Sequence, residues 1–313
     1  METFVNVDNF VRAETDRMFS DIQRDAGGVN RFRHNRAPAS IDEQTVIRLN
    51  RDTLYSFAIV DLDGGATLTL PETGDRYLSA MIVNNDHLVT AIFHDAGDYR
   101  LDRDTTGSRH ALVAVRILVD PSDPDDVDQV AALQDQLVIT ADAGEAFASP
   151  AYDPASLDAT RSALLSLAAG LRGFDHMFGT RDQVELVRHL IGTAAGWGGL
   201  PTTEAVYMGG AHPGEGDYQL VMADVPVDAF WSISVYNAQG YFEKNPYDLY
   251  TVNSVTATPD ADGSVTVRFV TGEPTMPNAI PVPPGWNYLV RLYRPQAAIL
   301  DGSWRTPELT RIV

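Results

Sequence analysis

The stretch from Asn50 to Leu62 reads NRDTLYSFAIVDL and joins a group of hydrogen-bonding side chains to a very apolar run. Successive side chains of a strand point to opposite faces, so Thr53, Tyr55 and Phe57 share one face. Both faces are largely apolar, which predicts an inner strand that is covered on both sides. The polar group at its start either fastens a buried corner of the fold or lines a polar site.

Composition sets the class of protein. The chain has 313 residues, 44% hydrophobic and 21% charged, which is typical of a soluble globular protein with one large domain or two ordinary ones. A net charge of −20 argues against a nucleic-acid partner. The absence of cysteine excludes disulfides, thiolate metal sites and cysteine nucleophiles.

No apolar run reaches the length of a membrane span, so no membrane partner is expected. The first eleven residues hold Glu2 and Asp8 and no lysine, unlike a cleaved leader. We therefore expect a cytoplasmic protein.

The chain divides into three parts by its periodicity. Apolar residues recur at helical spacing from Val5 to about Ala26, and Gly27 and Gly28 then end that helix. Short strand-like runs separated by turn clusters follow from Val46 to Val119, and again beyond Thr202. The residues between these regions, 153–197, carry two helical apolar stripes.

This pattern predicts a mainly β protein with two antiparallel β-sandwich modules, jelly-roll-like in character, joined by a helical segment and preceded by an N-terminal helix. The predicted boundaries are 1–150, 151–201 and 202–313.

Two arginines lie in the middle of predicted strands on otherwise apolar faces. Arg116 shares its side with leucine and alanine side chains, and Arg291 shares its side with Tyr293. Each needs a carboxylate, a ligand anion or a route to water. Facing one cleft, they would form an anion site, but a structural ion pair or an open sheet face explains them equally.

Other candidates come from strand and helix ends. Asp86 and His87 end one strand, where they could orient a substrate or simply form a polar turn. His189 lies four residues after Glu185 and beside Arg188, an arrangement that fits a carboxylate-oriented imidazole or an ordinary surface pair. Trp286 follows a glycine on a loop, where an aromatic ring can flank a pocket or pack in the core.

Sequence motifs for cofactors are lacking. No His-x-His pair, His-Glu-x-x-His run, phosphate-cradling loop or dinucleotide fingerprint occurs. We predict neither a metal nor a cofactor.

The chain resembles a bacterial family that joins two modules, domain of unknown function twelve-fifty-four and domain of unknown function twelve-fourteen. The resemblance rests on the motifs 50–56, 69–77 and 114–121 in the first module, and on 188–194 and 197–199 in the joint. In the second module it rests on 230–237, 240–242, 245–247, 262–265, 285–288, 291–293 and 299–304. It implies two β-sandwich modules linked by helices and a homo-oligomer, and it prescribes no reaction.

The leading hypothesis is a cofactor-independent acid/base enzyme, a hydrolase, lyase or isomerase, acting on a small polar or anionic substrate between the modules. Asp52 would be the general base or acid, Tyr55 a proton donor or oxyanion partner, and His189 the alternative base. The predicted substrate-binding residues are Asn50, Arg51, Thr53, Asp86, His87, Arg116, Arg188, Trp197, Trp286, Arg291 and Tyr293.

Two other functions remain open from the sequence. One is a non-catalytic carbohydrate- or metabolite-binding protein, and the other is an assembly scaffold whose polar clusters only fix corners of the fold. Stability separates a structural Asp52 from a catalytic one. The Asp52→Asn variant should lose roughly 1–3 kcal/mol if Asp52 is structural, and should keep or gain stability while activity falls if Asp52 is catalytic.

Overall fold

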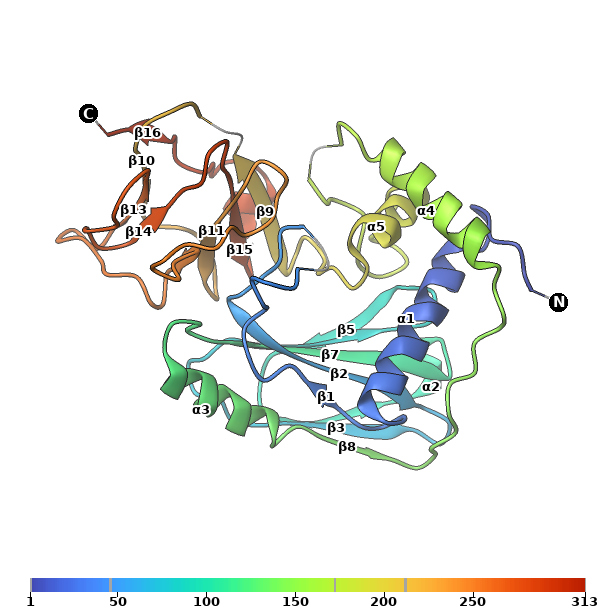
Figure 1. The fold of residues 1–313 in the computed structure, drawn as a ribbon. Helices are drawn as coiled ribbons and strands as arrows, with labels where there is room; N and C mark the ends of the chain where they lie inside the picture. The colour runs from blue at the N-terminus through green and yellow to red at the C-terminus, as the bar shows by residue number, and fades with distance from the viewer. Residues whose placement is uncertain (1, 45–46, 172, 211–212, 313) are drawn as a thin grey trace. The chain divides into compact units, whose positions relative to one another are not determined.

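A computed structural model describes residues 2–44, 47–171, 173–210 and 213–312, and it confirms the mainly β fold with an N-terminal helix (Figure 1). The chain forms two compact units. The first comprises Met1–Arg36, Leu54–Leu118 and Asp128–Thr202, and the second comprises Ala37–Thr53, Val119–Val127 and Thr203–Val313. Two short stretches from the N-terminal half therefore belong to the C-terminal unit.

The first unit contains a five-stranded and a three-stranded sheet. The five-stranded sheet has the order β1 (Arg33–His34), β2 (Thr53–Asp61), β7 (His110–Leu118), β4 (Leu78–Val83) and β5 (Val89–Phe93). The three-stranded sheet has the order β6 (Gly97–Leu101), β3 (Ala66–Leu70) and β8 (Val138–Ala141). Strand β2 lies inside its sheet and seven of its nine residues are buried, which confirms the prediction of an inner strand.

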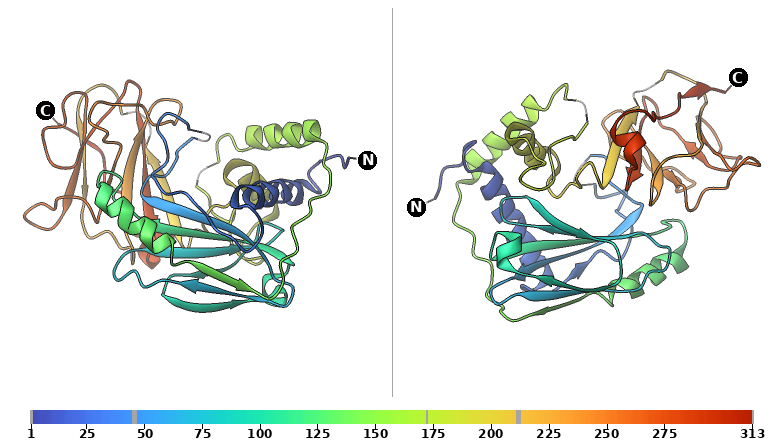
Figure 2. Two further views of the ribbon diagram at one scale, coloured as in Figure 1. Left: turned by 60° about the horizontal axis from the view of Figure 1, so that its bottom comes forward. Right: turned by 180° about the vertical axis from the view of Figure 1, so that it is seen from behind.

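Helices α1 (Phe10–Ala26), α4 (Pro154–Leu167) and α5 (Leu186–Gly196) pack together in the first unit, as Figures 1 and 2 show. They share a small apolar core that includes Phe10, Leu164 and Ile191. Helix α1 ends where expected, because Gly27 adopts the left-handed conformation at φ 74° that a glycine tolerates. The remaining helices are α2 (Arg103–Thr106), α3 (Pro124–Gln134) and α6 (Ala297–Leu300).

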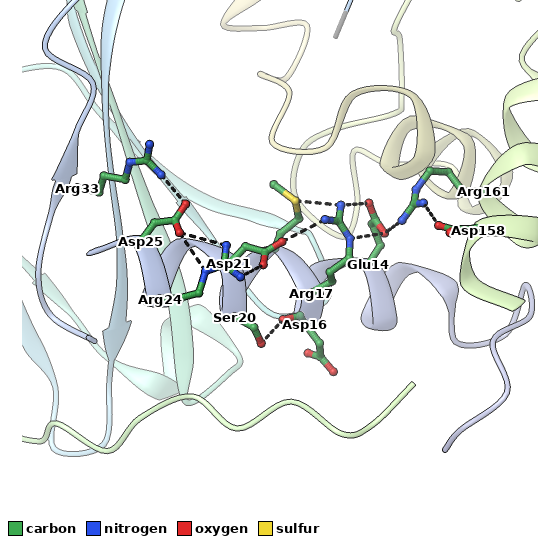
Figure 3. Close-up of polar contacts among 11 residues, drawn as sticks. Glu14, Asp16, Arg17, Ser20, Asp21, Arg24, Asp25, Arg33, Asp158 and Arg161 are labelled. Atoms are coloured by element: carbon green, nitrogen blue, oxygen red, sulfur yellow. Dashed lines mark hydrogen bonds and ion pairs between the residues drawn. The ribbon is translucent and has the colours of Figure 1, made fainter. Parts of the chain in front are cut away.

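One side of α1 carries a network of ion pairs (Figure 3). The Glu14 carboxylate is buried and accepts hydrogen bonds from Arg17 and Arg161. Burial alone would raise the pKa of Glu14, but the two arginines lower it below its usual value. The network joins α1 to α4, since Arg161 of α4 pairs with Glu14 of α1 as well as with Asp158 of its own helix, the latter at 2.6 Å.

The second unit is a sandwich of two four-stranded sheets, which form separate layers in Figure 1. One sheet has the order β12 (Thr251–Asn253), β11 (Trp231–Tyr236), β15 (Asn287–Tyr293) and β9 (Ala205–Gly210). The other has the order β14 (Ala279–Pro281), β13 (Val265–Val270), β10 (Tyr218–Met222) and β16 (Thr310–Arg311). All pairings are antiparallel among the described strands of this unit except β13 with β14, which is parallel.

Alternation along β11 and β15 gives their sheet two different faces. Ile233 and Val290 point into the core between the sheets, whereas Ser234 and Arg291 lie on the opposite face. The stretch 37–53 belongs to this unit and its residues contact that opposite face. We call it the polar sheet face.

In the described parts of the chain, no helix combines the length and apolar character needed to cross a lipid bilayer.

Candidate functional site

Asp52 is enclosed on the polar sheet face and is 0% exposed. One carboxylate oxygen accepts a hydrogen bond from the Ser232 hydroxyl at 2.6 Å, and the other accepts one from the Thr251 hydroxyl at 3.0 Å. Its carbonyl oxygen accepts from the Val119 amide at 2.9 Å. These bonds fasten the stretch 37–53 to β11 and β12, so the carboxylate serves as an anchor in this geometry.

Arg291 lies beside this anchor and is 2% exposed. Its guanidinium donates to the Ser234 hydroxyl at 2.8 Å, the Tyr236 hydroxyl at 2.6 Å, and the carbonyl oxygens of Arg48 and Leu49 at 2.9 and 3.1 Å. Burial would lower the pKa of Arg291, but nearby groups that include the Tyr236 phenol and the Asp52 carboxylate raise it. The charge is therefore kept and compensated inside the second unit.

Asn50 completes this cluster. Its amide donates to the Tyr293 hydroxyl at 3.1 Å and to the Thr53 hydroxyl at 3.3 Å, while its oxygen accepts from the Asp52 amide at 2.9 Å. The structure thus brings together five predicted site residues, Asn50, Asp52, Thr53, Arg291 and Tyr293. Their hydrogen bonds link these residues to one another and to the sheet.

Arg51 has different surroundings, although it is the neighbour of Asp52. It is 8% exposed, donates to the Ala39 carbonyl oxygen, and lies with its guanidinium carbon 5.4 Å from the centre of the Tyr250 ring. Its Nε is buried, and the described residues provide neither a hydrogen-bond partner for it nor a carboxylate within ion-pair distance of the guanidinium. Burial lowers the pKa of Arg51, and nearby acidic groups such as Asp248 offset only part of that effect.

Arg51 lines a hollow of about 160 Å³ in the second unit. The other lining residues are Asp120, Pro121, Ser122, Asp248, Leu249, Tyr250, Thr251, Val252, Asn253, Thr256, Ala257 and Asn278. Most of them are polar, and all of them belong to the same compact unit.

Asn253 is the second buried donor at this hollow, with an exposed fraction of 0%. Its side-chain oxygen accepts from the amides of Val255 and Thr256, both at 2.9 Å, and from the Thr256 hydroxyl at 3.1 Å. These three donors fix which end of the amide is oxygen. The Asn253 nitrogen is then a buried donor without a partner among the described residues.

In the first unit, His87 is buried at the centre of a second polar cluster. The Gly198 amide donates to its Nε2 at 2.9 Å. The Thr193 hydroxyl, 2.8 Å from Nδ1, already donates to the His189 carbonyl oxygen, so Nδ1 must carry the proton. The ring stacks on Trp197 at 5.3 Å, and burial, together with the charge of His189, holds the pKa of His87 well below its usual value.

His189 has both ring nitrogens occupied by backbone oxygens. Nδ1 lies 2.8 Å from the Met177 carbonyl oxygen, and Nε2 lies 3.2 Å from that of Asp86. Its ring stacks on His87 at 5.3 Å. Neither nitrogen is directed at open space, so the predicted role as an alternative base finds no support in this geometry.

Arg116 and Tyr55 also belong to the first unit. The Arg116 guanidinium carbon lies 5.4 Å from the centre of the Tyr55 ring, and its Nη2 donates to the Gly198 carbonyl oxygen at 2.9 Å. The Gly198 peptide therefore links Arg116 to His87. This is a second gathering of predicted residues, and its members belong to the first unit.

The remaining candidate residues, Asp86, Arg188 and Trp286, each contact their own local partners. Asp86 forms an ion pair with Arg12 on the surface, and Arg188 donates to the carbonyl oxygens of Asp175 and Gly173. Trp286 is 2% exposed and stacks on Phe269 in the core of the sandwich. Its packing is that of a core residue, which is one of the two roles that its position after a glycine predicts.

Sequence reasoning did not single out Asn253 or Asp248. A polar amide at the end of the apolar run after Tyr250 was the available signal for Asn253. Asp120 and Ser122 also line the hollow, and nothing in the local sequence pattern shows that they gather there with Asn253. Among the described residues, no three His, Asp or Glu side chains gather as a metal site.

The fold and these clusters define a protein of two β-rich units in which polar residues mainly fasten the fold, and the second unit contains the polar hollow beside Arg51. Comparison with known families places it further. Residues 29–97 match the family described as a protein of unknown function, DUF1254, and residues 202–297 match that described as a protein of unknown function, DUF1214. The chain belongs to the two-module family that joins them.

Two solved structures have the same overall fold. The VPA0106 protein from Vibrio parahaemolyticus is 18% identical with a TM-score of 0.74, and the match covers 99% of this chain and 100% of that one. A putative uncharacterized protein from Burkholderia cenocepacia is 15% identical with a TM-score of 0.54, covering 96% of this chain and 87% of that one. No curated protein matches this chain.

Proposed function

We propose that the second unit binds a small polar molecule in the hollow beside β12. The observation that carries the proposal is the buried side chain of Arg51, which lines that hollow and whose Nε has no partner among the described residues. A buried donor without an acceptor costs about 1–3 kcal/mol. A ligand that offers an acceptor oxygen would remove this cost.

Asn253 strengthens the proposal, because this residue also lines the hollow and its buried nitrogen has no partner among the described residues. Two residues with orphaned buried donors at one hollow are unusual, since native proteins pair nearly all such groups or leave them to bound water or ligand. The volume of about 160 Å³ suits a molecule of metabolite size rather than a polymer.

Binding without catalysis fits these residues better than acid/base chemistry. A general base must reach the proton that it takes, at about 2.6–3.2 Å or through one water. Asp52 is enclosed and bonded through both carboxylate oxygens. The acid/base enzyme, and its site between the modules, remain predictions that a search for product formation checks.

Equilibrium dialysis of the full chain against a mixture of small acids, amino acids, polyols and sugars, read by mass spectrometry, tests the proposal. Ser122 lines the hollow and is exposed, so the variant Ser122→Trp should fill the hollow without disturbing the core. Ser303→Trp is the matched control. Each serine amide donates to an aspartate two residues earlier, at 2.9 Å in both turns, but Ser303 does not line the hollow.

We expect wild type and Ser303→Trp to retain the same compound and Ser122→Trp to retain at least tenfold less. Equal retention by all three proteins, or retention of nothing by wild type, would overturn the proposal. Release of a chemically altered compound would instead establish catalysis.

The expected cytoplasmic location and homo-oligomer accompany this proposal as separate predictions. Cell fractionation and analytical ultracentrifugation of the full chain check them.

A further inference from the structure

The hollow carries groups of both signs, and this restricts the molecule that the proposed function requires. Its donors are Arg51 and Asn253, which are both buried. Its carboxylates are Asp120 and Asp248, which are more exposed. The deep part of the hollow therefore calls for an acceptor, and the outer part calls for a donor or a cation.

The charges of the lining residues distinguish between the possible classes of ligand. The lining contains one arginine and two aspartates, which gives a net charge of −1. A simple anion would satisfy Arg51 but meet two carboxylates of the same sign. A simple cation would satisfy the carboxylates but leave the buried guanidinium unpaired. A molecule with both charges complements all three residues.

The guanidinium of Arg51 is arranged for a carboxylate. One terminal nitrogen already donates to the Ala39 carbonyl oxygen, and the Nε side has no described partner. A carboxylate on that side would accept from Arg51 in the forked geometry that guanidinium and carboxylate share. Asn253 would add a donor from the neighbouring strand.

The two aspartates keep acceptor capacity for an ammonium group. One oxygen of Asp120 accepts from the Ser122 amide and hydroxyl at 2.9 and 2.6 Å, and its other oxygen has no partner in the described chain. Asp248 lies in a turn with a left-handed backbone at φ 54°. Burial first, and then the charge of Asp248 and its hydrogen bond with the phenol, raise the pKa of Tyr250, which also lines the hollow.

We infer that the hollow takes a small zwitterion of the α-amino acid type, with its carboxylate against Arg51 and Asn253 and its ammonium group toward Asp248 and Asp120. This inference rests on the proposed function. The volume of about 160 Å³ suits a small member of that class, such as glycine, alanine or serine.

Isothermal titration of the full chain with charge-deleted analogues tests the inference. The probes are L-alanine, propionate, which lacks the ammonium group, L-alaninamide, which lacks the carboxylate, and glycerol, which lacks both. We expect L-alanine to bind at least tenfold tighter than each of the other three.

Variants assign the charges to residues. Asp248→Asn should weaken L-alanine binding five- to tenfold and leave propionate binding unchanged or stronger, because only the ammonium group loses its partner. Asp224→Asn is the matched control, since Asp224 is also an exposed aspartate in the left-handed conformation, at φ 45°, and does not line the hollow.

Each outcome decides the inference. If propionate, L-alaninamide or glycerol binds wild type more tightly than L-alanine does, and Ser122→Trp abolishes that binding, the inference of a zwitterion is wrong. The proposed function is then still supported. Binding of L-alanine that neither Ser122→Trp nor Asp248→Asn alters would place it elsewhere and overturn the inference. If wild type binds none of the probes, the inference of a zwitterionic ligand is wrong, and the dialysis experiment alone then tests the proposed function.

Discussion

The polar sheet face and the hollow share strand β12, yet their hydrogen bonding differs. On the sheet face, both oxygens of Asp52 have hydroxyl donors, and Arg291 donates to four oxygen atoms. At the hollow, Arg51 and Asn253 each keep a buried donor without a described partner. All four residues are buried, but only those of the sheet face have partners for the donors and acceptors described.

This difference teaches that burial of a charged residue does not by itself mark a site. Asp52 and Arg51 are neighbours in one motif, and only the second leaves a donor for a ligand. Mutation of Asp52 or Arg291 should therefore lower the free energy of unfolding. Mutation at the hollow should instead weaken ligand binding. The predictions below test this division, beginning with the largest effect.

Arg291→Met should destabilise the second unit by about 3–5 kcal/mol, because it leaves buried oxygen acceptors and the Asp52 charge without their partner. Urea unfolding followed by tryptophan fluorescence measures this loss. Arg305→Met, at an exposed position, should change the free energy of unfolding by less than about 0.5 kcal/mol. A similar small change in both variants would show that the sheet face does not depend on this charge.

Asp52→Asn should cost about 1–3 kcal/mol, because asparagine keeps one acceptor but loses the charge that faces Arg291. Ligand binding at the hollow should stay within about twofold of wild type under conditions where the variant is folded. Unchanged stability with lost turnover of a substrate would instead restore the catalytic assignment. The same urea series and a titration provide both readings.

His87 extends the comparison to the first unit, since it is buried and satisfied as a neutral ring. Its folded pKa lies well below the unfolded value of about 6.5, so the unfolded state binds a proton first as the pH falls. The contribution of the neutral His87 ring to the free energy of unfolding is complete above pH ~6.5. It is lost as the pH falls toward the pKa of the folded state. The slope is at most about 1.4 kcal/mol per pH unit.

His87→Asn should flatten the loss of unfolding free energy between about pH 6.5 and 5, whatever it does to stability at neutral pH. His176→Asn is its control, because His176 is exposed and both histidines have φ 59°. An identical pH slope in wild type and His87→Asn would contradict a neutral buried ring.

Arg51→Lys should have the smallest effect on stability, under about 1 kcal/mol, because the positive charge is kept. Ligand affinity should nevertheless fall about tenfold, since lysine lacks the forked donors of the guanidinium. Thermal unfolding and titration measure the two effects. If Arg51→Lys loses more stability than Asp52→Asn, then Arg51 and not Asp52 is the structural anchor, and the proposed assignment is wrong.

Much of the fold follows from local sequence. Glycine and aspartate turns between apolar runs predicted the strands, and Gly27 with Gly28 predicted the end of α1. The run 46–49 also seemed strand-like, but residues 47–49 form a turn and loop, and residue 46 lies outside the described chain. The stretch 37–53 is held by long-range bonds, such as that from Asp52 to Ser232, which no local pattern contains.

The candidate residues were predictable as a set, but their roles were not. A buried polar residue looks the same in sequence whether its partner is a hydroxyl 180 positions away, as for Asp52, or missing, as for the Arg51 Nε. Arg116 and Arg291 were expected at one cleft, yet each is bonded within its own unit. Only coordinates could separate these cases.

A crystal structure of the full chain with the compound that wild type retains in dialysis is the most direct test of the division between anchor and hollow. The expected result is ligand density in the hollow, with an acceptor atom within about 3.2 Å of the Arg51 Nε or the Asn253 nitrogen. Density beside Asp52 with the Ser232 or Thr251 bond broken, or an empty hollow with the compound bound elsewhere, would contradict the account.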